Sequence, residues 1–299
     1  MNRNDIELIV MAYNRSHHTL SVLNALEKEK VNSITLYLDA PTNEFDEKEQ
    51  NTIKRQLGAY SYSVEVIERA QNLGLALSIT KAVTEVLERK EAVIVLEDDC
   101  VPEPGFIKYM LTMLKTHHNN KNIGSICGYM YPGIAEKAEP FFAINRFCPW
   151  GWATWRDRWA GFSLNLREVV SQTEYLNKDI SELGKDIHDY CNDDRFLDSK
   201  MDIWSLNWIL RQFSKNMKIV YPKHSLINNI GFDGTGVHSV ETNAFEVHYD
   251  LETTQEMSHF LDSEALYFNV NIDSSVESQI IKFLEKNSKM TYILDSSKG

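Results

Sequence analysis

The sequence predicts an α/β protein with a mainly parallel central sheet flanked by helices, and the distribution of apolar residues supports this. Short, nearly continuous apolar runs alternate with longer amphipathic segments through the first hundred residues. Parallel strands are buried on both faces and therefore give such runs, and a helical crossover joins each strand to the next. Beyond this region the alternation is lost, which predicts strands of mixed direction in the second half.

The elements of the first half occur in the order β-α-β-α-β-α-β, which favours a parallel sheet with right-handed crossovers. Strands are predicted at Ile6–Ala12, Ser33–Leu38, Val64–Ile67 and Ala92–Leu96. Helices are predicted from Ser16 to Glu29, over Phe45–Gly58 and over Leu73–Arg89. Ser16 is expected to cap the first helix, because its side-chain oxygen can accept a hydrogen bond from a free backbone amide.

The second half has a less regular pattern. Helices are expected at about Pro104–His117 and at Met201–Ser214. Short strands are predicted at Gly124–Tyr129, Phe141–Phe147, Met217–Tyr221 and Leu226–Asn229, followed by a glycine-rich loop at Gly231–Ser239. From about Phe245 the periodicity weakens, and this part is expected to add a strand and a helix over Ser275–Asn287.

The composition argues against several classes of protein. The formal net charge is -12, whereas a protein that binds nucleic acid usually presents a basic face. The four cysteines lack a Cys-x-x-Cys spacing, so neither a zinc knuckle nor a disulfide framework is expected. No segment approaches the roughly 20 apolar residues of a membrane helix, and the N-terminus has no signal-peptide pattern. We therefore expect a soluble cytoplasmic protein with reduced thiols, in contact at most with a membrane surface.

Carboxylates follow two of the predicted parallel strands. Asp39 comes after the second strand, and Glu97, Asp98 and Asp99 come after the fourth. Ligands of open α/β sheets bind at the carboxyl ends of the strands. Consecutive carboxylates repel one another and are costly to bury, and a divalent cation such as Mg²⁺ or Mn²⁺ relieves that cost while also binding phosphate oxygens. The pattern favours a metal site, and a solvated acidic turn is the alternative.

Four short motifs in this order resemble those of the GT-A fold glycosyltransferases, and more narrowly those of the N-acetylglucosaminyltransferase I type and its bacterial relatives. The motifs are IVMAYNR, VLEDDCVPEPGF, CPWGWATWRDRW and FDGTGVHS, and they cover roughly Ile6 to Ser239. The resemblance implies a Rossmann-like GT-A fold. It also implies a donor-binding half at 1–123, an acceptor-binding and catalytic half at 124–244, and a C-terminal appendage at 245–299.

The same resemblance implies roles for the acidic residues. Asp99 would bind Mn²⁺ or Mg²⁺ directly, Asp98 would support it or reach the ribose or sugar of the donor, and Glu97 would orient the sugar hydroxyls. Asp39 would accept a hydrogen bond from the uracil or ribose of a UDP-sugar, which is the donor that the resemblance favours. An aspartate before Pro41 equally suits a turn.

Three further donor-side contacts are implied by the resemblance. Arg15 would contact the nucleotide, Asn72 would contact the donor, and His238 would lie near the metal or the diphosphate. Glycines around His238 let the loop fold closely around phosphates. The residues alone also allow a solvated arginine, a helix-entry turn and a histidine bonded to backbone.

Asp202 lies in the segment KMDIWSLNW, which resembles a tryptophan-rich helix whose carboxylate is the general base of the family. The implied reaction is an inverting displacement, in which the acceptor hydroxyl attacks the anomeric carbon opposite the leaving diphosphate and gives its proton to Asp202. A first-turn aspartate would also favour the helix dipole. The other acidic candidates are Asp193, Asp194 and Asp198.

Tryptophans are concentrated in the third motif. Trp150, Trp152 and Trp155 would line the acceptor side, although core packing is expected for at least one of them. Trp150 stands where the family has glycine, so the identity of the acceptor is not carried over. An oligosaccharide or glycolipid in surface polysaccharide synthesis is expected, and N-acetylglucosamine is the sugar that the resemblance implies.

Other classes of protein share parts of this pattern. A sugar-1-phosphate nucleotidyltransferase usually has a glycine-rich basic loop after its first strand, whereas this chain has AYNRSHH. A metal phosphohydrolase would need a second cluster of histidines and carboxylates. A carbohydrate-binding protein without turnover would not need the acid triplet together with Asp202. These comparisons favour a glycosyltransferase.

Overall fold

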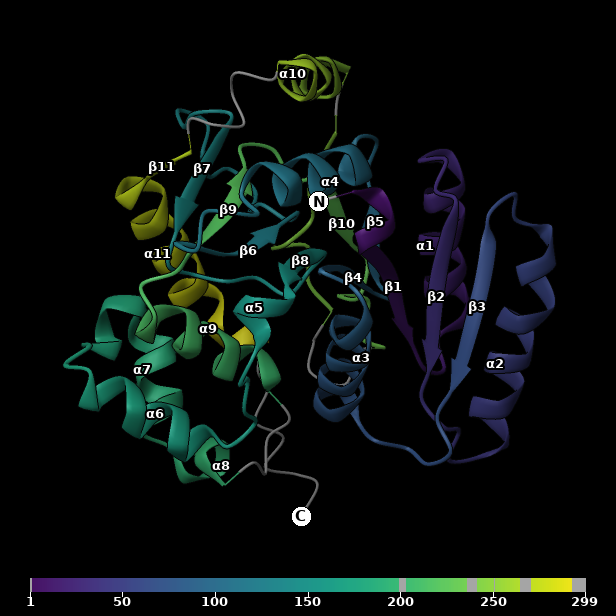
Figure 1. Ribbon diagram of the computed structural model, residues 1–299, viewed down its shortest axis with the longest axis horizontal. Coiled ribbons are helices and arrows are strands. Elements are labelled where there is room, and N and C mark those ends of the chain that lie inside the picture. The colour runs from purple at the N-terminus through teal and green to yellow at the C-terminus, as the bar shows by residue number, and fades with distance from the viewer. Residues whose placement is uncertain (1, 199–202, 236–240, 250, 264–269, 292–299) are drawn as a thin grey trace.

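The computed structural model describes residues 2–198, 203–235, 241–249, 251–263 and 270–291 (Figure 1). In these ranges nine strands form one sheet. In spatial order the strands are β11 (Asn271–Ile272), β7 (Phe141–Ile144), β9 (Lys218–Pro222), β6 (Ile123–Cys127), β8 (Trp152–Trp155), β4 (Ala92–Glu97), β1 (Ile6–Ala12), β2 (Ser33–Leu38) and β3 (Ser63–Glu68). A second, two-stranded sheet pairs β5 (Cys100–Pro102) with β10 (Ile227–Asn229).

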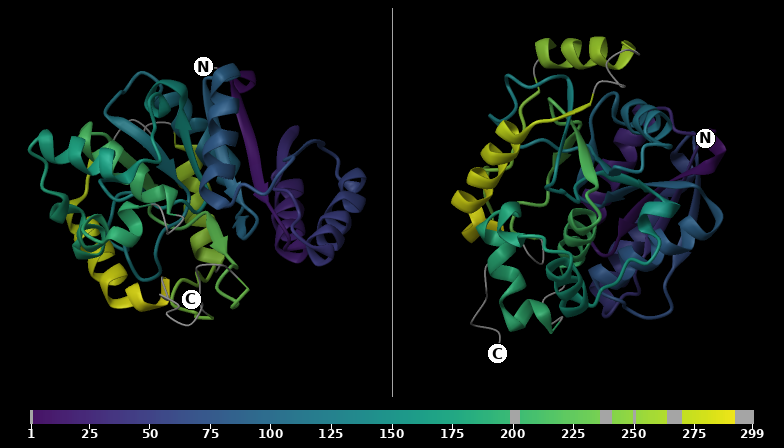
Figure 2. Two further views of the ribbon diagram at one scale, coloured as in Figure 1. Left: turned by 90° about the horizontal axis from the view of Figure 1, so that it is seen from below. Right: turned by 60° about the vertical axis from the view of Figure 1, so that its left-hand side comes forward.

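Helices cover both sides of the large sheet (Figure 2). Those of the first half are α1 (Ser16–Lys28), α2 (Glu44–Gln56), α3 (Leu75–Arg89) and α4 (Phe106–Thr116). Those of the second half are α5 (Arg156–Trp159), α6 (Leu166–Tyr175), α7 (Lys185–Cys191), α8 (Asp194–Leu197) and α9 (Trp204–Ser214), and they gather at the lower left of Figure 1. Two more, α10 (Leu251–Asp262) and α11 (Ser274–Thr291), follow.

The first half of the chain forms the parallel sheet that the sequence predicts. Strand β1 pairs in parallel with both β2 and β4, and β2 pairs in parallel with β3. In this register Ala12 lies opposite Leu38, and Met11 lies opposite Glu97. The carboxyl ends of β1, β2 and β4 therefore meet at one edge of the sheet, and the predicted fold class is confirmed.

Strand β8 was not expected and connects the two halves of the sheet. It runs antiparallel to β4 on one side and to β6 on the other. Because helices and loops cover both faces at this point, Trp152 and Trp155 are both completely buried. Trp152 packs against Phe147 and Trp204, and Trp155 donates its indole N–H to the Leu114 carbonyl at 3.1 Å.

The prediction that Trp152 and Trp155 line the acceptor side is therefore wrong. Strand β8 is covered on both faces, so neither indole is available to a sugar. Only the third member of the set, Trp150, remains partly exposed.

Other differences concern the second half and the ends of helices. Helices α5, α6, α7, α8 and α10 were not predicted. Helices α5, α7 and α8 are short, whereas α6 buries Leu166, Val169, Val170 and Thr173 at helical spacing, a signal that the sequence analysis could have used. In α1 the N-cap position belongs to Arg15 and has no side-chain cap, so Ser16 does not have the expected role. The predicted C-terminal strand and helix are present as β11 and α11.

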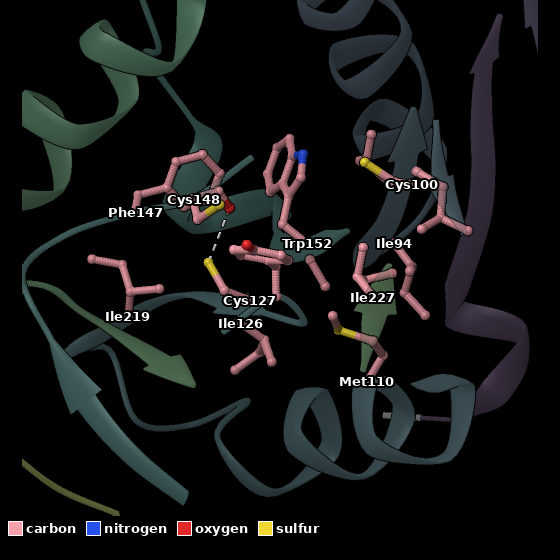
Figure 3. Close-up of a cluster of buried hydrophobic side chains, with 14 of the residues drawn as sticks. Ile94, Cys100, Met110, Ile126, Cys127, Phe147, Cys148, Trp152, Ile219 and Ile227 are labelled. Carbon is pink, nitrogen blue, oxygen red and sulfur yellow. Dashed lines mark hydrogen bonds between the residues drawn. The ribbon is translucent and has the colours of Figure 1, made fainter. Parts of the chain in front are cut away.

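The core beside β8 contains three of the four cysteines (Figure 3). The Cys127 thiol donates to the carbonyl of Cys148 at 3.2 Å. Burial raises the pKa of Cys148 to about 12 and that of Cys100 well above its ordinary value, so both stay protonated at neutral pH. All four cysteines are buried free thiols that pack as small apolar side chains.

Across the described ranges, no helix has both the length and the apolar character needed to cross a bilayer.

Replacing Trp152 with alanine is expected to lower the free energy of unfolding by about 3–5 kcal/mol, because the change leaves a large cavity between β8 and its neighbours. Urea unfolding followed by circular dichroism measures this loss. The matched control is Tyr175→Ala, since Tyr175 is 86% exposed and its loss should change stability by less than about 0.5 kcal/mol. Equal unfolding midpoints for the two variants would contradict the buried position of Trp152.

Candidate active site

A cleft of about 500 Å³ opens where the carboxyl ends of β1, β2 and β4 face segments of the second half of the chain. Its first wall comes from the loops after these strands, and its second wall from residues 149–150, 203–205 and 229–235. The cleft brings together these residues named from the sequence: Arg15, Asp39, Asn72, Glu97, Asp98, Asp99 and Trp150.

The acid triplet lies where β4 leaves the sheet and enters the cleft. Glu97 is the last residue of the strand, and Asp98 is 7% exposed. Burial raises the pKa of Glu97 well above its ordinary value, and the charges of Asp99 and Asp98 raise it further. Burial and the charge of Asp99 also raise the pKa of Asp98. The three carboxyl groups therefore lie close together, and ionising all of them carries an electrostatic cost.

Arg15, at the end of β1, offsets part of that cost. Its Nη2 donates to Asp99 Oδ2 at 2.8 Å and also to Asp98 Oδ1, while its Nε donates to Asp98 Oδ2 at 3.1 Å. Burial opposes the charge on Arg15, but the two aspartates outweigh it and raise the pKa of the guanidinium. Arg15 was predicted to contact the nucleotide. In the structure it pairs with Asp98 and Asp99, which border the cleft together with it.

The net charge of these side chains favours the binding of a divalent cation. With all three acids ionised, one guanidinium leaves two negative charges in excess. Within the described ranges, no three Asp, Glu, His or Cys side chains form a closed metal site. Mg²⁺ that serves a nucleotide substrate uses one or two carboxylates and takes its other ligands from phosphates and water. Asp98 and Asp99 fit such an open site, whereas His238 lies outside the described residues.

Asp39 and Asn72 join the loop after β2 to the loop after β3. The carboxylate of Asp39 accepts hydrogen bonds from the backbone N–H of Ala40, Leu73 and Gly74 at 2.9–3.0 Å. Asn72 donates its side-chain amide to the Ala40 carbonyl at 2.9 Å. Both side chains border the cleft, and their hydrogen bonds fix the turn that leads into α3. Asp39 thus holds the chain after β2 to residues 73–74, which differs from the local turn before Pro41 that the sequence allowed.

Asp46, in the first turn of α2, is a supporting residue that the sequence analysis missed. It is buried and accepts from the Tyr13 hydroxyl at 2.5 Å, the Asn14 amide at 2.8 Å and the Thr42 N–H at 2.9 Å. Asn43 caps the helix by accepting from the Asp46 N–H at 3.0 Å. An Asn-x-x-Asp spacing at a helix start was the signal that could have indicated this arrangement.

A second contact from α2 holds the same turn. Glu49 accepts from the Ser16 N–H at 3.0 Å and from the Ser16 hydroxyl at 2.6 Å. This bond explains why Ser16 does not cap α1. Together Asp46 and Glu49 fix the turn that carries Arg15 to the acid triplet.

The second wall of the cleft is aromatic. Trp150 is partly exposed, and its ring lies 4.6 Å from that of Tyr129 and 5.3 Å from that of Phe232, both edge to face. Ile203, Trp204 and Ser205 border the cleft next to it. Asp202, the predicted general base, lies outside the described residues.

The alternative acids form ion pairs with arginines outside the cleft. Arg167 pairs with Asp194 and Asp198 at 2.7 Å, and Asp193 pairs with Arg195, so these acids do not border the cleft. Cleft residues that the sequence did not indicate are Met11, Tyr13, Asn14, Leu75, Ser78, Trp204, Ser205, Asn229, Phe232 and Thr235. Leu75, Ser78 and Asn229 lie outside the quoted motifs, whereas the other seven lie within IVMAYNR, KMDIWSLNW or FDGTGVHS, which gave them no individual role.

A mainly parallel sheet with acids and an arginine at its carboxyl edge, opposed by an aromatic second wall, agrees with the GT-A fold expected from the sequence. The model for glycosyl transferase family 2 matches residues 7–170, more than half of the 299 residues. The chain belongs to this family. The narrower resemblance to N-acetylglucosaminyltransferase I is not supported. No curated protein matches the sequence.

Several solved structures are similar to this chain. Residues 1-349 of TarS from S. aureus match with 13% identity and a TM-score of 0.44, over 94% of this chain and 71% of that TarS fragment. The mannosyltransferase PcManGT from Pyrobaculum calidifontis, in complex with GDP-Man and Mn²⁺, matches with 12% identity and a TM-score of 0.42, over 95% and 87%. A 4-diphosphocytidyl-2C-methyl-D-erythritol synthase from Anaerococcus prevotii matches with 11% identity and a TM-score of 0.38, over 86% and 96%.

Asp46 is expected to make stability depend on pH. Burial alone would raise its pKa, but hydrogen bonds from Asn14, Tyr13 and Thr42 prevail and hold the pKa well below its ordinary value. Its contribution is therefore complete above the unfolded-state pKa of about 4 and is lost as pH falls toward the lower, folded-state pKa. Asp46→Asn should lose about 1–3 kcal/mol at pH 7 and less at pH 3.

Urea unfolding at pH 7, 5 and 3 measures this difference. Glu47→Gln is the control, because Glu47 is an exposed acid in the same helical turn. Wild type and Glu47→Gln should lose stability in parallel toward acid pH. An Asp46→Asn profile parallel to theirs would show that the buried hydrogen bonds do not depend on the charge.

Proposed function

We propose that this glycosyltransferase is metal-dependent and inverting, and that it transfers a sugar from a UDP-sugar to a hydroxyl of an oligosaccharide or glycolipid. The observation that carries the proposal is the convergence of Asp98, Asp99 and Arg15 at one edge of the sheet, inside a cleft with a second, aromatic wall. The sequence resemblance supplies UDP as the first nucleotide to test.

The donor side of the proposal rests on charge. The buried acids carry more negative charge than Arg15 neutralises, and a nucleoside diphosphate would add more. Asp98 and Asp99 would hold Mn²⁺ or Mg²⁺, which when bound stabilises the charge that develops on a departing diphosphate. Arg15 would keep the two carboxylates in place. The turns fixed by Asp39 and Asp46 would keep this wall in shape without a ligand.

The acceptor side rests on the second wall. A partly exposed indole such as Trp150 offers a flat apolar face, which suits the apolar face of a sugar ring. Residues of both halves of the chain line the cleft, which supports a donor-binding half at 1–123 and an acceptor-binding half at 124–244. Residues 245–299 would be an appendage, since none of the described residues in this range lines the cleft, although Phe245 packs against Trp150 and Phe232 from behind.

Proton removal is assigned to Asp202 on the basis of the sequence. The three residues after it, 203–205, border the cleft, which supports a base near the acceptor hydroxyl. A single carboxylate is sufficient, because a metal-stabilised diphosphate leaves without a general acid.

Calorimetry with UDP tests the donor site. UDP is expected to bind with Mn²⁺ present and to lose affinity in excess EDTA, because the buried acids repel the diphosphate when no cation is bound. Asp99→Ala should abolish the metal-dependent binding, whereas Asp194→Ala should not change it, since Asp194 is exposed outside the cleft. Binding that is indifferent to EDTA would overturn the metal dependence. Absence of binding for UDP, GDP, CMP and dTDP alike would overturn the donor proposal.

Asp202→Asn tests the base. Loss of the proton acceptor should lower the transfer rate by about 10²–10⁴-fold while UDP still binds. The control is Asp198→Asn, because Asp198 is a neighbouring acid that pairs with Arg167. The rate is measured as UDP release from UDP-N-acetylglucosamine with a mixture of oligosaccharide acceptors. A near-normal rate for Asp202→Asn would show that another group takes the proton.

A further inference from the structure

Gly231 lies directly against the carboxylate of Asp99, although the two residues are far apart in sequence. Strands β10 and β5 pair in antiparallel register, with Asn229 opposite Cys100. The ladder continues one step further, because the Ile230 N–H donates to the backbone carbonyl of Asp99 at 2.9 Å. Gly231 follows and is buried at the edge of the cleft.

This contact leaves no room for a side chain. A Cβ atom built on Gly231 would lie 2.2 Å from Asp99 Oδ2 and 2.8 Å from its Cγ. Carbon and oxygen atoms do not approach so closely, so either the carboxylate or the backbone would have to move. Moving the carboxylate would disturb the hydrogen bonds that it accepts, from Arg15 to Oδ2 at 2.8 Å and from the Cys100 thiol to Oδ1 at 3.4 Å.

Backbone conformation does not explain the glycine. Seven described glycines have positive φ, among them Gly74 and Gly234, and Gly231 is not one of them. A residue with a side chain could therefore adopt the backbone of position 231 without strain. The requirement for glycine is the space that the Asp99 carboxylate occupies.

We propose that Gly231 is a positioning residue for Asp99, and that any side chain at position 231 displaces the carboxylate from the place where it holds a divalent cation and the diphosphate of the donor. The proposal rests on the proposed function of the cleft. It adds a residue to that site which touches neither sugar nor base and acts only through Asp99.

Displacement of Asp99 has a specific consequence. The bond between Arg15 and Asp99 would break, while Arg15 would keep both of its bonds to Asp98. The cleft would therefore retain its charge and one acidic ligand but lose the position of the other. We expect weaker metal binding in a protein that is still folded, which differs from a general loss of stability.

The first experiment compares Mn²⁺ binding to wild type, Gly231→Ala and Gly58→Ala in the presence of UDP, by the electron paramagnetic resonance signal of free Mn²⁺. Gly58 is the matched control, because a Cβ there meets nothing within 4 Å and its φ is not positive. Gly231→Ala should weaken Mn²⁺ binding by about 10- to 100-fold, the effect of disturbing a ligand's supporting contact. Gly58→Ala should bind as wild type.

The second experiment is a double-mutant cycle in urea without metal, which also serves if Gly231→Ala alone does not fold. Asp99→Ala removes the carboxylate that the new methyl group would meet. Gly231→Ala should therefore lower the unfolding midpoint of wild type by more than that of Asp99→Ala, where only the Cβ of residue 99, 3.1 Å from the new methyl group, remains in the way. The doubly substituted protein should fold.

The outcomes separate two failures. A wild-type protein that binds neither Mn²⁺ nor UDP overturns the proposed function, and the inference about Gly231 with it. If the wild-type protein binds both, two results overturn the role of Gly231 alone. One is an unchanged Mn²⁺ affinity in Gly231→Ala, and the other is an equal stability loss in both backgrounds of the cycle.

Discussion

The excess of buried negative charge at the end of β4 is the constraint on which the rest of the site depends. Glu97, Asp98 and Asp99 are held at the edge of a sheet whose interior is apolar, and burial raises the pKa of the first two. Arg15 can offset this charge because β1 lies next to β4. The order of strands therefore decides the electrostatics of the cleft, and the charge left over explains why a cation would bind there.

Much of the polar chemistry around the cleft maintains the protein itself. Asp39 accepts three backbone hydrogen bonds, and Asp46 fixes the turn that carries Tyr13 and Asn14. Gly231 contributes by having no side chain. Groups held in this way position a site before its ligand arrives, which reduces the cost of ordering it on binding. The cleft is thus built from supporting contacts as well as from groups that would touch the substrate.

The tryptophan-rich segment 148–159 shows how one motif can serve two purposes. Trp150 borders the cleft, whereas Trp152, two residues later, lies in a central strand and is buried. Strand β8 joins the parallel half to the mixed half, so its burial couples the two walls of the cleft. The motif therefore combines a surface for a ligand with the packing that holds that surface in place.

The sequence by itself determined the parallel half, because buried strands and amphipathic helices have local periodicities and a helix joins each predicted strand to the next. It also indicated that Asp39 and the acid triplet would share an edge. It could not determine that β8 enters the sheet, that Arg15 pairs with Asp98, or that Gly231 makes room for Asp99. These depend on contacts between residues far apart in the chain, which leave no local pattern and exist only once the chain has folded.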